Sequence, residues 1–561
     1  MMTHCYTTLE RPVLGLLASA CLALAPCAIS AAEPAGDSHF LDLRRMPDAA
    51  AAITETGSVD LQLGADGHWQ GGDIDVLTVV KADGLHVELS APNAAVKKLH
   101  LRWKGAIDPA WKCLGDVWER GYGDLQWGAL DGGRSMPWYF LASDGKMTNG
   151  YGVMTGPAAL CSWKADAAGI SLWADVRCGG MGVKLGKRRL AACTVTCRPG
   201  KAGESPFAAA QALCRQMCPK PRLPAQPVYG FNDFYGFFGY NTAEIFMRDS
   251  TAVIGLAANL KNRPIALIDA GWQVENGENS CSGPAVSWAR TSSRFGSSLE
   301  KLVKHIRALD ARPGIWYRPL AAVPHQPPQW RLSRDTKFLD PSVPEVLKQV
   351  SADCAHFRSL GFKLIKHDFS TFDIAGRWGI QLDDHSLFSD GWAFADRSRT
   401  TAEVILDLYR AMREGAGDDV LIIGCNTMSH LSAGLFELQR AGDDNGKEWS
   451  RTLADGVNCL AFRAPQNGTF YVVDADCMGI TPGAGQPWEK NRQWLDLLAR
   501  SGTSMFASLT TPDLGADQQQ AIRAAFAIAS EPQPLGEPLD WMQTRTPARW
   551  RLMGKEVQFN W

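Results

Sequence analysis

The stretch LIKHDF, residues 364–369, places a short apolar strand directly in front of a carboxylate, Asp368. Similar apolar runs recur through the second half of the chain, and amphipathic segments separate them. In one such segment, Ser297–Leu309, the apolar residues fall on one helical face. Buried strands that alternate with helices predict βα units and a parallel sheet.

Eight strands follow from this pattern, and eight βα units predict a (β/α)₈ barrel. The predicted strands are Val228–Asn232, Pro264–Asp269, Arg312–Tyr317, Lys363–Asp368, Val420–Cys425, Glu437–Arg440, Thr469–Asp474 and Thr503–Leu509. The active site of such a barrel is built at the C-terminal ends of its strands. Asp269, Asp368, Asp444 and Asp474 lie at or just after such ends. Because buried strands that finish in acids are costly unless the acids face a polar site, we expect a functional site there.

The first part of the chain has a different pattern. Residues 37–197 contain short alternating runs broken by Gly, Asp and Asn, which predict antiparallel strands and a β-sandwich. A short helix is expected at Phe207–Cys218, and the four prolines of Pro219–Pro227 indicate a linker. The predicted organisation is an N-terminal β-sandwich domain at 33–218, a linker at 219–227, a barrel at 228–530 and a short C-terminal β segment at 531–561.

Composition narrows the class of protein. A chain of 561 residues is long enough for a barrel and one or two smaller domains. Hydrophobic residues make up 45% and charged residues 21%, which is ordinary for a globular protein. The net charge of −2 provides no excess of basic residues to neutralise phosphates, so a nucleic-acid partner is not expected.

The N-terminus indicates export. Arg11 precedes the apolar stretch Val13–Ile29 and the small residues up to Ala32, which predicts a signal peptide over 1–32 and a periplasmic or extracellular protein. A lipoprotein box before Cys21 fits less well. No later segment is long and apolar enough to span a membrane.

The cysteine count fits the same compartment. Of the 15 cysteines, three fall in the predicted signal peptide, and the twelve that remain predict disulfides. Cys193 with Cys197, and Cys214 with Cys218, have a spacing seen in zinc sites. Because no histidine lies near either pair in sequence, we expect no bound metal.

Further motifs accompany the predicted barrel strands in order. GFNDFYGFFGYNTAEI begins at Gly230, ALIDAGW at Ala266, RPGIWYRP at Arg312, VDADCM at Val473 and MFASL at Met505. Together with LIKHDF they resemble the ordered motifs of clan D glycoside hydrolases, families 27 and 36, the α-galactosidase group. The resemblance covers about 228–529. It implies an exo-acting retaining α-glycosidase with an oligosaccharide or glycan substrate and no cofactor.

The resemblance also implies roles for single residues. LIKHDF resembles the family motif L-x-K-x-D, which assigns the nucleophile to Asp368 and sugar binding to Lys366. In family 27 the sixth-strand signature is an Arg, an acid/base Asp four residues later and a Trp nine residues after the Arg. Arg440, Asp444 and Trp449 keep both intervals. The resemblance therefore implies that Asp444 is the acid/base and that Arg440 binds the sugar.

The chain also departs from the family pattern. The second-strand motif implies that Asp269 holds sugar hydroxyls, but Ala270 stands where a second acid is usual. A cysteine shortly after the nucleophile, common in family 27, is absent. The glycine-rich sixth-strand pattern of family 36 is absent too, although a β-sandwich before the barrel is more like family 36. The sequence therefore combines features of both families.

The residues support the same chemistry without the resemblance. Glycoside cleavage with retention needs one ionised carboxylate to attack the anomeric carbon and a second carboxyl to protonate the leaving oxygen. Lys366 lies two residues before Asp368, on the same face of the strand, and should keep it ionised. Asp443 precedes Asp444, and their repulsion should raise the proton affinity of one of them. Asp443 is therefore the rival candidate for the acid/base.

Several other residues are candidate contacts. Aromatic rings stack on the CH faces of sugars, so Trp272, Trp316 and Trp378 are candidate platforms. Asp474 is a candidate substrate contact, with a structural role as the alternative. His367 faces the opposite side of its strand, and we expect it to be structural. The sequence leaves open whether Trp118-Glu119-Arg120 or Trp138-Tyr139 reaches the barrel mouth.

Two other functional classes compete with a glycosidase. A metal-dependent hydrolase barrel predicts an H-x-H motif or clustered histidines, which the predicted mature chain lacks. A non-catalytic glycan-binding barrel would be expected to have lost one of the two acids, and both are present. Among glycosidases, β-L-arabinopyranosides and α-glucans stay open beside α-galactosides because of Ala270.

Overall fold

A computed structural model describes residues 40–274, 285, 287–296, 298–383, 387–481, 486–511 and 514–561. The predicted signal peptide lies outside the described residues, as does Cys281. Within this part of the chain, no helix is long and apolar enough to cross a membrane.

The described residues contain a closed barrel of eight parallel strands, which confirms the predicted fold class. Its strands are β15 (Tyr229–Asn232), β16 (Ile265–Ile268), β17 (Arg312–Tyr317), β18 (Leu364–His367), β19 (Leu421–Gly424), β20 (Leu438–Arg440), β21 (Val472–Ile480) and β22 (Ser504–Leu509). The first strand also pairs with the last, which closes the barrel. Seven strands agree with their predicted ranges to within a residue or two at each end.

The seventh strand differs from its prediction. It extends to Ile480, because the register of its ladder with β22 shifts between Asp474 and Cys477 and pairing resumes after this bulge. Asp476 takes up the irregularity with a φ of 71°. A bulge of this kind redirects side chains at the rim of a barrel.

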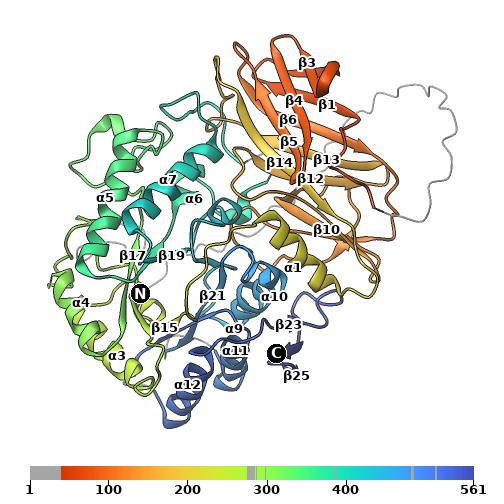
Figure 1. The fold of residues 1–561 in the computed structure, drawn as a ribbon. Coiled ribbons are helices and arrows are strands. Elements are labelled where there is room, and N and C mark those ends of the chain that lie inside the picture. Colours follow the sequence, from red (N-terminus) through yellow and green to blue (C-terminus); the bar gives the residue numbers. More distant parts are fainter. Residues whose placement is uncertain are drawn as a thin grey trace, which may run out of the picture. The chain divides into compact units, whose positions relative to one another are not determined.

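Helices surround the barrel. The main ones are α3 (Ala243–Gly255), α4 (Leu299–Ala308), α5 (Pro344–Leu360), α7 (Thr401–Ala416), α11 (Trp488–Arg500) and α12 (Ala516–Ala529). Figure 1 shows α3, α4 and α5 outside strands β15 and β17. The side chain of Ser298 caps α4 by accepting from Lys301 N–H, and Thr400 with Glu403 forms a capping box on α7.

The remaining α-helices are shorter. Within the barrel region they are α2 (Phe234–Phe237), α6 (Ser370–Ala375), α8 (Ser429–Ser432), α9 (Trp449–Arg451) and α10 (Cys459–Arg463). A π-helical stretch, Thr452–Asn458, joins α9 to α10, so the connection after β20 is not a regular single helix. This is the connection that follows Asp444.

The N-terminal strands form an antiparallel sandwich, which confirms the second element of the predicted fold. Their order is β8 (Gly128–Ala129), β7 (Lys112–Gly115), β10 (Tyr139–Ser143), β11 (Thr148–Val153), β14 (Leu190–Arg198), β5 (Gly84–Ser90), β4 (Ile74–Lys81), β3 (His68–Gly71), β2 (Ser58–Leu63), β1 (Ala49–Thr54), β6 (Val96–Lys104), β13 (Gly169–Asp175), β12 (Leu160–Asp166) and β9 (Met136–Pro137). Strand β2 joins the two halves of this ladder. Phe140 of one half contacts Trp163 of the other, with ring centroids 6.1 Å apart.

The segments between and after these units agree with the pattern read from the sequence. Helix α1 (Pro206–Met217) begins at a Ser205 cap, and residues 219–227 lead from it to the barrel as a loop. The C-terminal part forms a sheet of β23 (Glu537–Pro538), β24 (Arg549–Leu552) and β25 (Lys555–Gln558). The exact domain boundaries stay a prediction.

The cysteines differ from expectation. The eleven that lie in the described residues are all buried free thiols, so the predicted disulfides are absent from this part of the chain. Two of the sulfurs lie close to oxygen atoms. Cys197 Sγ lies 3.3 Å from Asp42 Oδ1, and Cys178 Sγ lies 3.4 Å from the Asp396 carbonyl. Cys161 and Cys193 do lie side by side, but as two free thiols and not as a disulfide.

Candidate active site

The fourth barrel strand carries two charged side chains into the barrel. Leu364 belongs to the apolar cluster inside the barrel, and alternation along β18 puts Lys366 and Asp368 on the same side. Lys366 is buried, and its Nζ lies 2.7 Å from Asp269 Oδ2 on the second strand. Asp269 also accepts from Asn232 Nδ2 and from the Ala270 N–H. The structure therefore brings together three of the predicted site residues.

The Asp368 carboxylate is held by three hydrogen bonds. Trp316 Nε1 donates to Oδ2 at 3.0 Å, while Oδ1 accepts from the N–H groups of Phe369 at 2.8 Å and Asn426 at 3.2 Å. Burial raises the pKa of a carboxyl, but the charges of Lys366 and Arg120 outweigh burial and hold the pKa of Asp368 below its usual value. Asp368 is thus fixed in orientation and ionised, as a nucleophile must be.

Asp444 follows the sixth strand and is paired with Arg440. Arg440 Nη2 lies 3.0 Å from Asp444 Oδ1, and the Asp444 side chain is 25% exposed whereas Arg440 is 1% exposed. Burial again opposes ionisation, but the charges of Arg440, Arg120 and Lys366 lower the pKa of Asp444 to about 2. Asp444 is one of the groups that act on the pKa of Asp368, so the two carboxylates share one electrostatic environment.

The prediction that repulsion between Asp443 and Asp444 raises a proton affinity is wrong for Asp444. The cause lies in the cations that the fold brings to the pair. Asp443 Oδ1 lies 2.6 Å from Arg120 Nη2, and Asp443 Oδ2 lies 2.6 Å from Arg451 Nη2. Asp443 is therefore held by two arginines, whereas Asp444 is the more exposed of the two acids, at 25% against 16%.

Arg440 lies at the centre of a carboxylate cluster. Its Nη2 is 3.1 Å from Asp476 Oδ2, and its Nε is 3.6 Å from Asp474 Oδ2. Ser504 Oγ donates to Asp474 at 2.9 Å, and burial raises the pKa of Asp474 to about 6. Asp476 accepts from the Asn445 N–H and from the Tyr235 hydroxyl. The two acids of the seventh strand thus fix Arg440 in place.

The predicted aromatic platforms occupy different environments. Trp272 is fully buried, packs edge-on against Trp288 and Phe357, and donates from Nε1 to the Trp316 carbonyl at 3.0 Å. Its ring therefore presents no face to a ligand in this structure. Trp316 touches Asp368 through its indole N–H, and Trp378 lies 4.5 Å from Phe372 between ring centroids.

His367 is structural, as predicted, but its ring is not hydrogen-bonded. Neither ring nitrogen has a partner within the described residues. The ring packs against Tyr409 and Phe436, with centroids 5.5 and 5.7 Å away. Burial lowers the pKa of His367 to about 3, so the ring is neutral.

The structure shows that Arg120 of the N-terminal domain reaches the mouth of the barrel. The loop between β7 and β8 reaches the barrel mouth, where Arg120 Nη2 pairs with Asp443 and Arg120 Nη1 lies 3.5 Å from Cys425 Sγ. Arg440 Nη1 approaches the same sulfur to 3.3 Å. Arg120 lowers the pKa of both Asp368 and Asp444. Sequence reasoning pointed to Trp118-Glu119-Arg120 without assigning a role, because no local pattern encodes a contact such as that between Arg120 and Cys425, which are 305 positions apart.

Asn426 was missed altogether. It follows the fifth strand and is completely buried. Its N–H donates to Asp368, and its Nδ2 donates to Glu119 Oε1 at 2.6 Å. Its place just after a barrel strand was the only signal in the sequence, and that signal does not separate a site residue from an ordinary loop asparagine.

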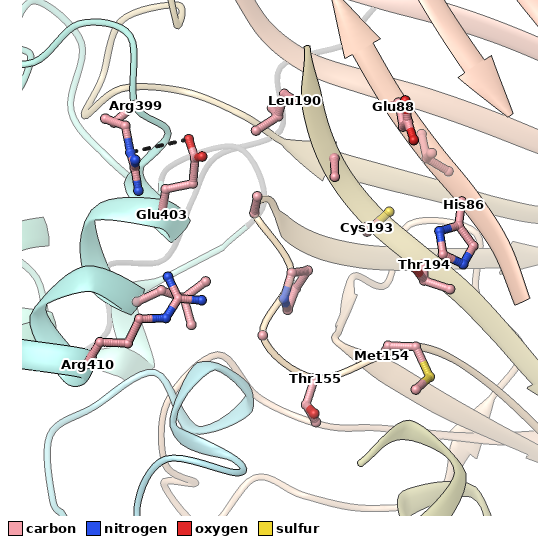
Figure 2. Close-up of a pocket in the computed structure, with 16 residues that line it drawn as sticks. His86, Glu88, Met154, Thr155, Leu190, Cys193, Thr194, Arg399, Glu403 and Arg410 are labelled. Atoms are coloured by element: carbon pink, nitrogen blue, oxygen red, sulfur yellow. Dashed lines mark ion pairs between the residues drawn. The ribbon is translucent and has the colours of Figure 1, made fainter. Parts of the chain in front are cut away.

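A pocket of about 310 Å³ lies elsewhere, between β5, β14 and the start of α7. Figure 2 shows Arg399, Glu403 and Arg410 on one side and His86 and Thr194 on the other. None of the predicted site residues lines it. No group of three or more metal-ligating side chains gathers anywhere in the described ranges.

Comparisons with known proteins show which fold this chain has. The chain matches no protein-family model and none of the curated proteins. An α-galactosidase from Thermus thermophilus, solved with p-nitrophenyl α-D-galactopyranoside, is 15% identical over 91% of this chain and 99% of that chain, with a TM-score of 0.56.

Two further solved structures have a similar extent of match. A family 36 α-galactosidase from Geobacillus stearothermophilus is 11% identical over 86% of this chain and 75% of that chain, with a TM-score of 0.52. An α-galactosidase from Lactobacillus brevis is 13% identical over 86% of this chain and 72% of that chain, also with a TM-score of 0.52. The chain therefore has the fold of the family 36 α-galactosidases, a (β/α)₈ barrel preceded by an antiparallel sandwich.

Proposed function

We propose that this protein is an exported, exo-acting retaining α-glycosidase, with Asp368 as nucleophile and Asp444 as general acid/base. The observation that carries the proposal is the environment of Asp368. Three hydrogen bonds orient its carboxylate, and the charges of Lys366 and Arg120 keep it ionised in a buried site. A carboxylate prepared in this way suits attack on an anomeric carbon.

The second carboxyl must deliver a proton to the leaving oxygen. Asp444 is a better candidate than Asp443, because Asp443 is bound on both oxygens by Arg120 and Arg451 whereas Asp444 is more exposed. In this structure the charge of Arg440 holds Asp444 ionised. In the proposed mechanism Arg440 donates hydrogen bonds to sugar hydroxyls when the substrate binds. Its ion pair with Asp444 is then weaker, so Asp444 can take up the proton.

The remaining polar groups of the barrel mouth are assigned to the sugar. Lys366 and Asp269 form a buried pair whose outer atoms would bind hydroxyls, and Asp474 supports Arg440. We propose an α-galactoside as the substrate, because solved structures with this fold are described as complexes with p-nitrophenyl α-D-galactopyranoside and with stachyose. Ala270 keeps β-L-arabinopyranosides and α-glucans as alternatives within the same mechanism.

The test is a panel of nitrophenyl glycosides given to the purified protein, with the anomeric configuration of the first-formed product read by NMR. Hydrolysis with retention supports the proposal. Inversion would overturn the proposal and indicate an inverting glycosidase. Binding of sugars without hydrolysis of any glycoside would also overturn it and indicate a non-catalytic glycan-binding barrel.

Matched aspartate variants then assign the roles. Asp368→Ala should remove turnover, and azide should give an inverted product. Asp444→Ala should still release dinitrophenol from an activated glycoside, and azide should rescue the second step with retention. Asp443→Ala is the control from the adjacent position. If Asp443→Ala behaves as expected for Asp444→Ala, the acid/base is Asp443.

A further inference from the structure

The loop between β7 and β8 inserts its backbone into the barrel mouth. Gly121 N–H donates to the Ala441 carbonyl at 2.8 Å, and Asp443 N–H donates to the Gly121 carbonyl at 3.1 Å, so the loop pairs like a short parallel strand with the segment after β20. Arg463 Nη1 donates to the Glu119 carbonyl at 2.9 Å. The loop is thus held at the Glu119 carbonyl by Arg463 and at Gly121 by the segment after β20.

The Glu119 side chain is sealed inside this interface and has no exposed surface. Its Oε1 accepts from Asn426 Nδ2 at 2.6 Å and from the Tyr122 hydroxyl at 3.0 Å. Its Oε2 has no hydrogen-bond partner in the part of the chain that the structure describes. A Cβ on Gly379 would lie 3.1 Å from Oε2, so the backbone of that residue closes the space beside the carboxyl.

Asn426 connects Glu119 to the nucleophile. Its N–H donates to Asp368 Oδ1 at 3.2 Å, its carbonyl accepts from Thr371 N–H at 3.1 Å, and its Oδ1 accepts from Phe372 N–H at 3.1 Å. Three of its polar groups therefore bind the segment that begins with the nucleophile. The fourth, Nδ2, binds Glu119, and without that partner it would be a buried donor left unpaired.

The charges around Glu119 are mixed. Arg120 Nε lies 3.2 Å from Oε1, and the carboxylates of Asp443 and Asp368 act on Glu119 from the barrel. Burial raises the pKa of Glu119 to about 7, with the two aspartates adding to this effect and Arg120 and Tyr122 opposing it. Glu119 Oε1 accepts hydrogen bonds in either protonation state, so the hydrogen bond from Asn426 does not depend on the charge of Glu119.

From this geometry we infer that Glu119 is a positioning residue for the nucleophile: it holds Asn426 so that the Asn426 N–H points at Asp368 Oδ1. The inference rests on the proposed function. Glu119 is too buried to touch a substrate and acts through Asn426. The N-terminal sandwich is therefore a structural part of the active site and supplies one of its fixed supports.

The test compares Glu119→Ala, Glu119→Gln and Glu403→Gln. Glu403 also joins the N-terminal strands to the barrel, through Arg188 at 2.8 Å, but it contacts neither Asn426 nor Asp368 in the hydrogen bonds and ion pairs described, so it is the matched control. Because a misplacement of about 1 Å can cost on the order of 100-fold in rate, Glu119→Ala should lower kcat on a dinitrophenyl glycoside by roughly 10- to 100-fold with KM nearly unchanged. Glu119→Gln should restore most of the rate, and Glu403→Gln should leave it intact.

A second variant covers the case in which Glu119→Ala fails to fold. Gly379→Ala places a Cβ 3.0 Å from Glu119 Cδ and 2.9 Å from Tyr122 Cε2, which pushes the carboxyl without removing it, and should lower kcat in the same way. Normal kcat in Glu119→Ala, or in Gly379→Ala if Glu119→Ala does not fold, would overturn the inference while the proposed function stands.

Crystal structures of the variants separate the two proposals. If the wild-type protein hydrolyses no glycoside, the proposed function fails, and the position of Asn426 still tests the inference. The expected result is that Asn426 moves away from Asp368 by about 1 Å in Glu119→Ala and stays in place in Glu119→Gln. An unmoved Asn426 in Glu119→Ala would refute the inference.

Discussion

Replacing Arg440 by methionine should raise the pKa of Asp444 and shift the pH dependence of catalysis. Arg440 Nη2 lies 3.0 Å from Asp444 Oδ1. With charge centres about 4 Å apart and an effective dielectric constant of about 20, such a pair interacts by about 4 kcal/mol, or about 3 pKa units. Methionine keeps much of the apolar stem and removes the charge. The pKa of Asp444 is about 2 in the wild-type protein, and in Arg440→Met it should rise to roughly 5.

The assay is kcat/KM for a galactoside with a poor leaving group, measured from about pH 4 to 7. This ratio reports ionisations of the free enzyme. Asp444 must be protonated to act as the acid, so in the wild-type protein kcat/KM should fall about tenfold for each pH unit. In Arg440→Met it should stay level until roughly pH 5 and then fall. Loss of a sugar contact would lower kcat/KM by the same factor at every pH, and would not change the pH at which kcat/KM begins to fall.

A dinitrophenyl galactoside is the control, because its leaving group needs little protonation and its kcat/KM should show no such slope in either protein. A wild-type profile that is already level from about pH 4 to 6 would contradict this prediction, since Asp444 would then keep its proton despite Arg440. Parallel profiles for wild type and Arg440→Met would show that Arg440 does not set the ionisation of Asp444.

Three further predictions concern stability and cofactors. Lys366→Met leaves Asp269 buried without its cation, so the free energy of unfolding should fall by about 3–5 kcal/mol in chemical denaturation at neutral pH; an unchanged midpoint would contradict the 2.7 Å pair. The pKa of Glu119 is raised from 4.5 to about 7 on folding. Its contribution to stability is therefore full below pH 4.5 and lost as the pH rises through 7, a change of about 3 kcal/mol. Glu119→Gln should remove this part of the pH dependence in thermal melts, whereas Glu403→Gln should keep it. Chelators should leave activity intact, and loss in EDTA with rescue by zinc or calcium would show that a metal takes part.

The barrel could be predicted from the sequence because the apolar patterns that indicate its strands and helices are local. A strand such as Leu364–His367 is an apolar run of four, and a helix such as Leu299–Ala308 repeats its apolar residues every three or four positions. Both patterns arise from burial of one face of an element. The bulge in Val472–Ile480 was not readable, because a register shift depends on the partner strand.

Only part of the candidate active site could be predicted from the sequence. Lys366 and Asp368 are two residues apart on one strand, so their shared face follows from alternation alone. Arg440 and Asp444 keep a fixed interval, and the structure joins them in an ion pair. The ionisation of Asp444 did not follow from its neighbour Asp443, because the arginines that decide it come partly from the N-terminal loop.

The order of the elements, the barrel and the strand ends at which charged residues gather could all be predicted from the sequence, since each of these depends on residues close together in the chain. The groups that surround the two carboxylates follow from the three-dimensional packing alone. Glu119 and Asn426 are 307 positions apart and still form a 2.6 Å hydrogen bond. Trp272, placed at a strand end by the sequence, is buried by packing against Trp288 and Phe357. Coulomb interactions and burial depend on distances in space, and these are set by the packing of whole elements rather than by local pattern.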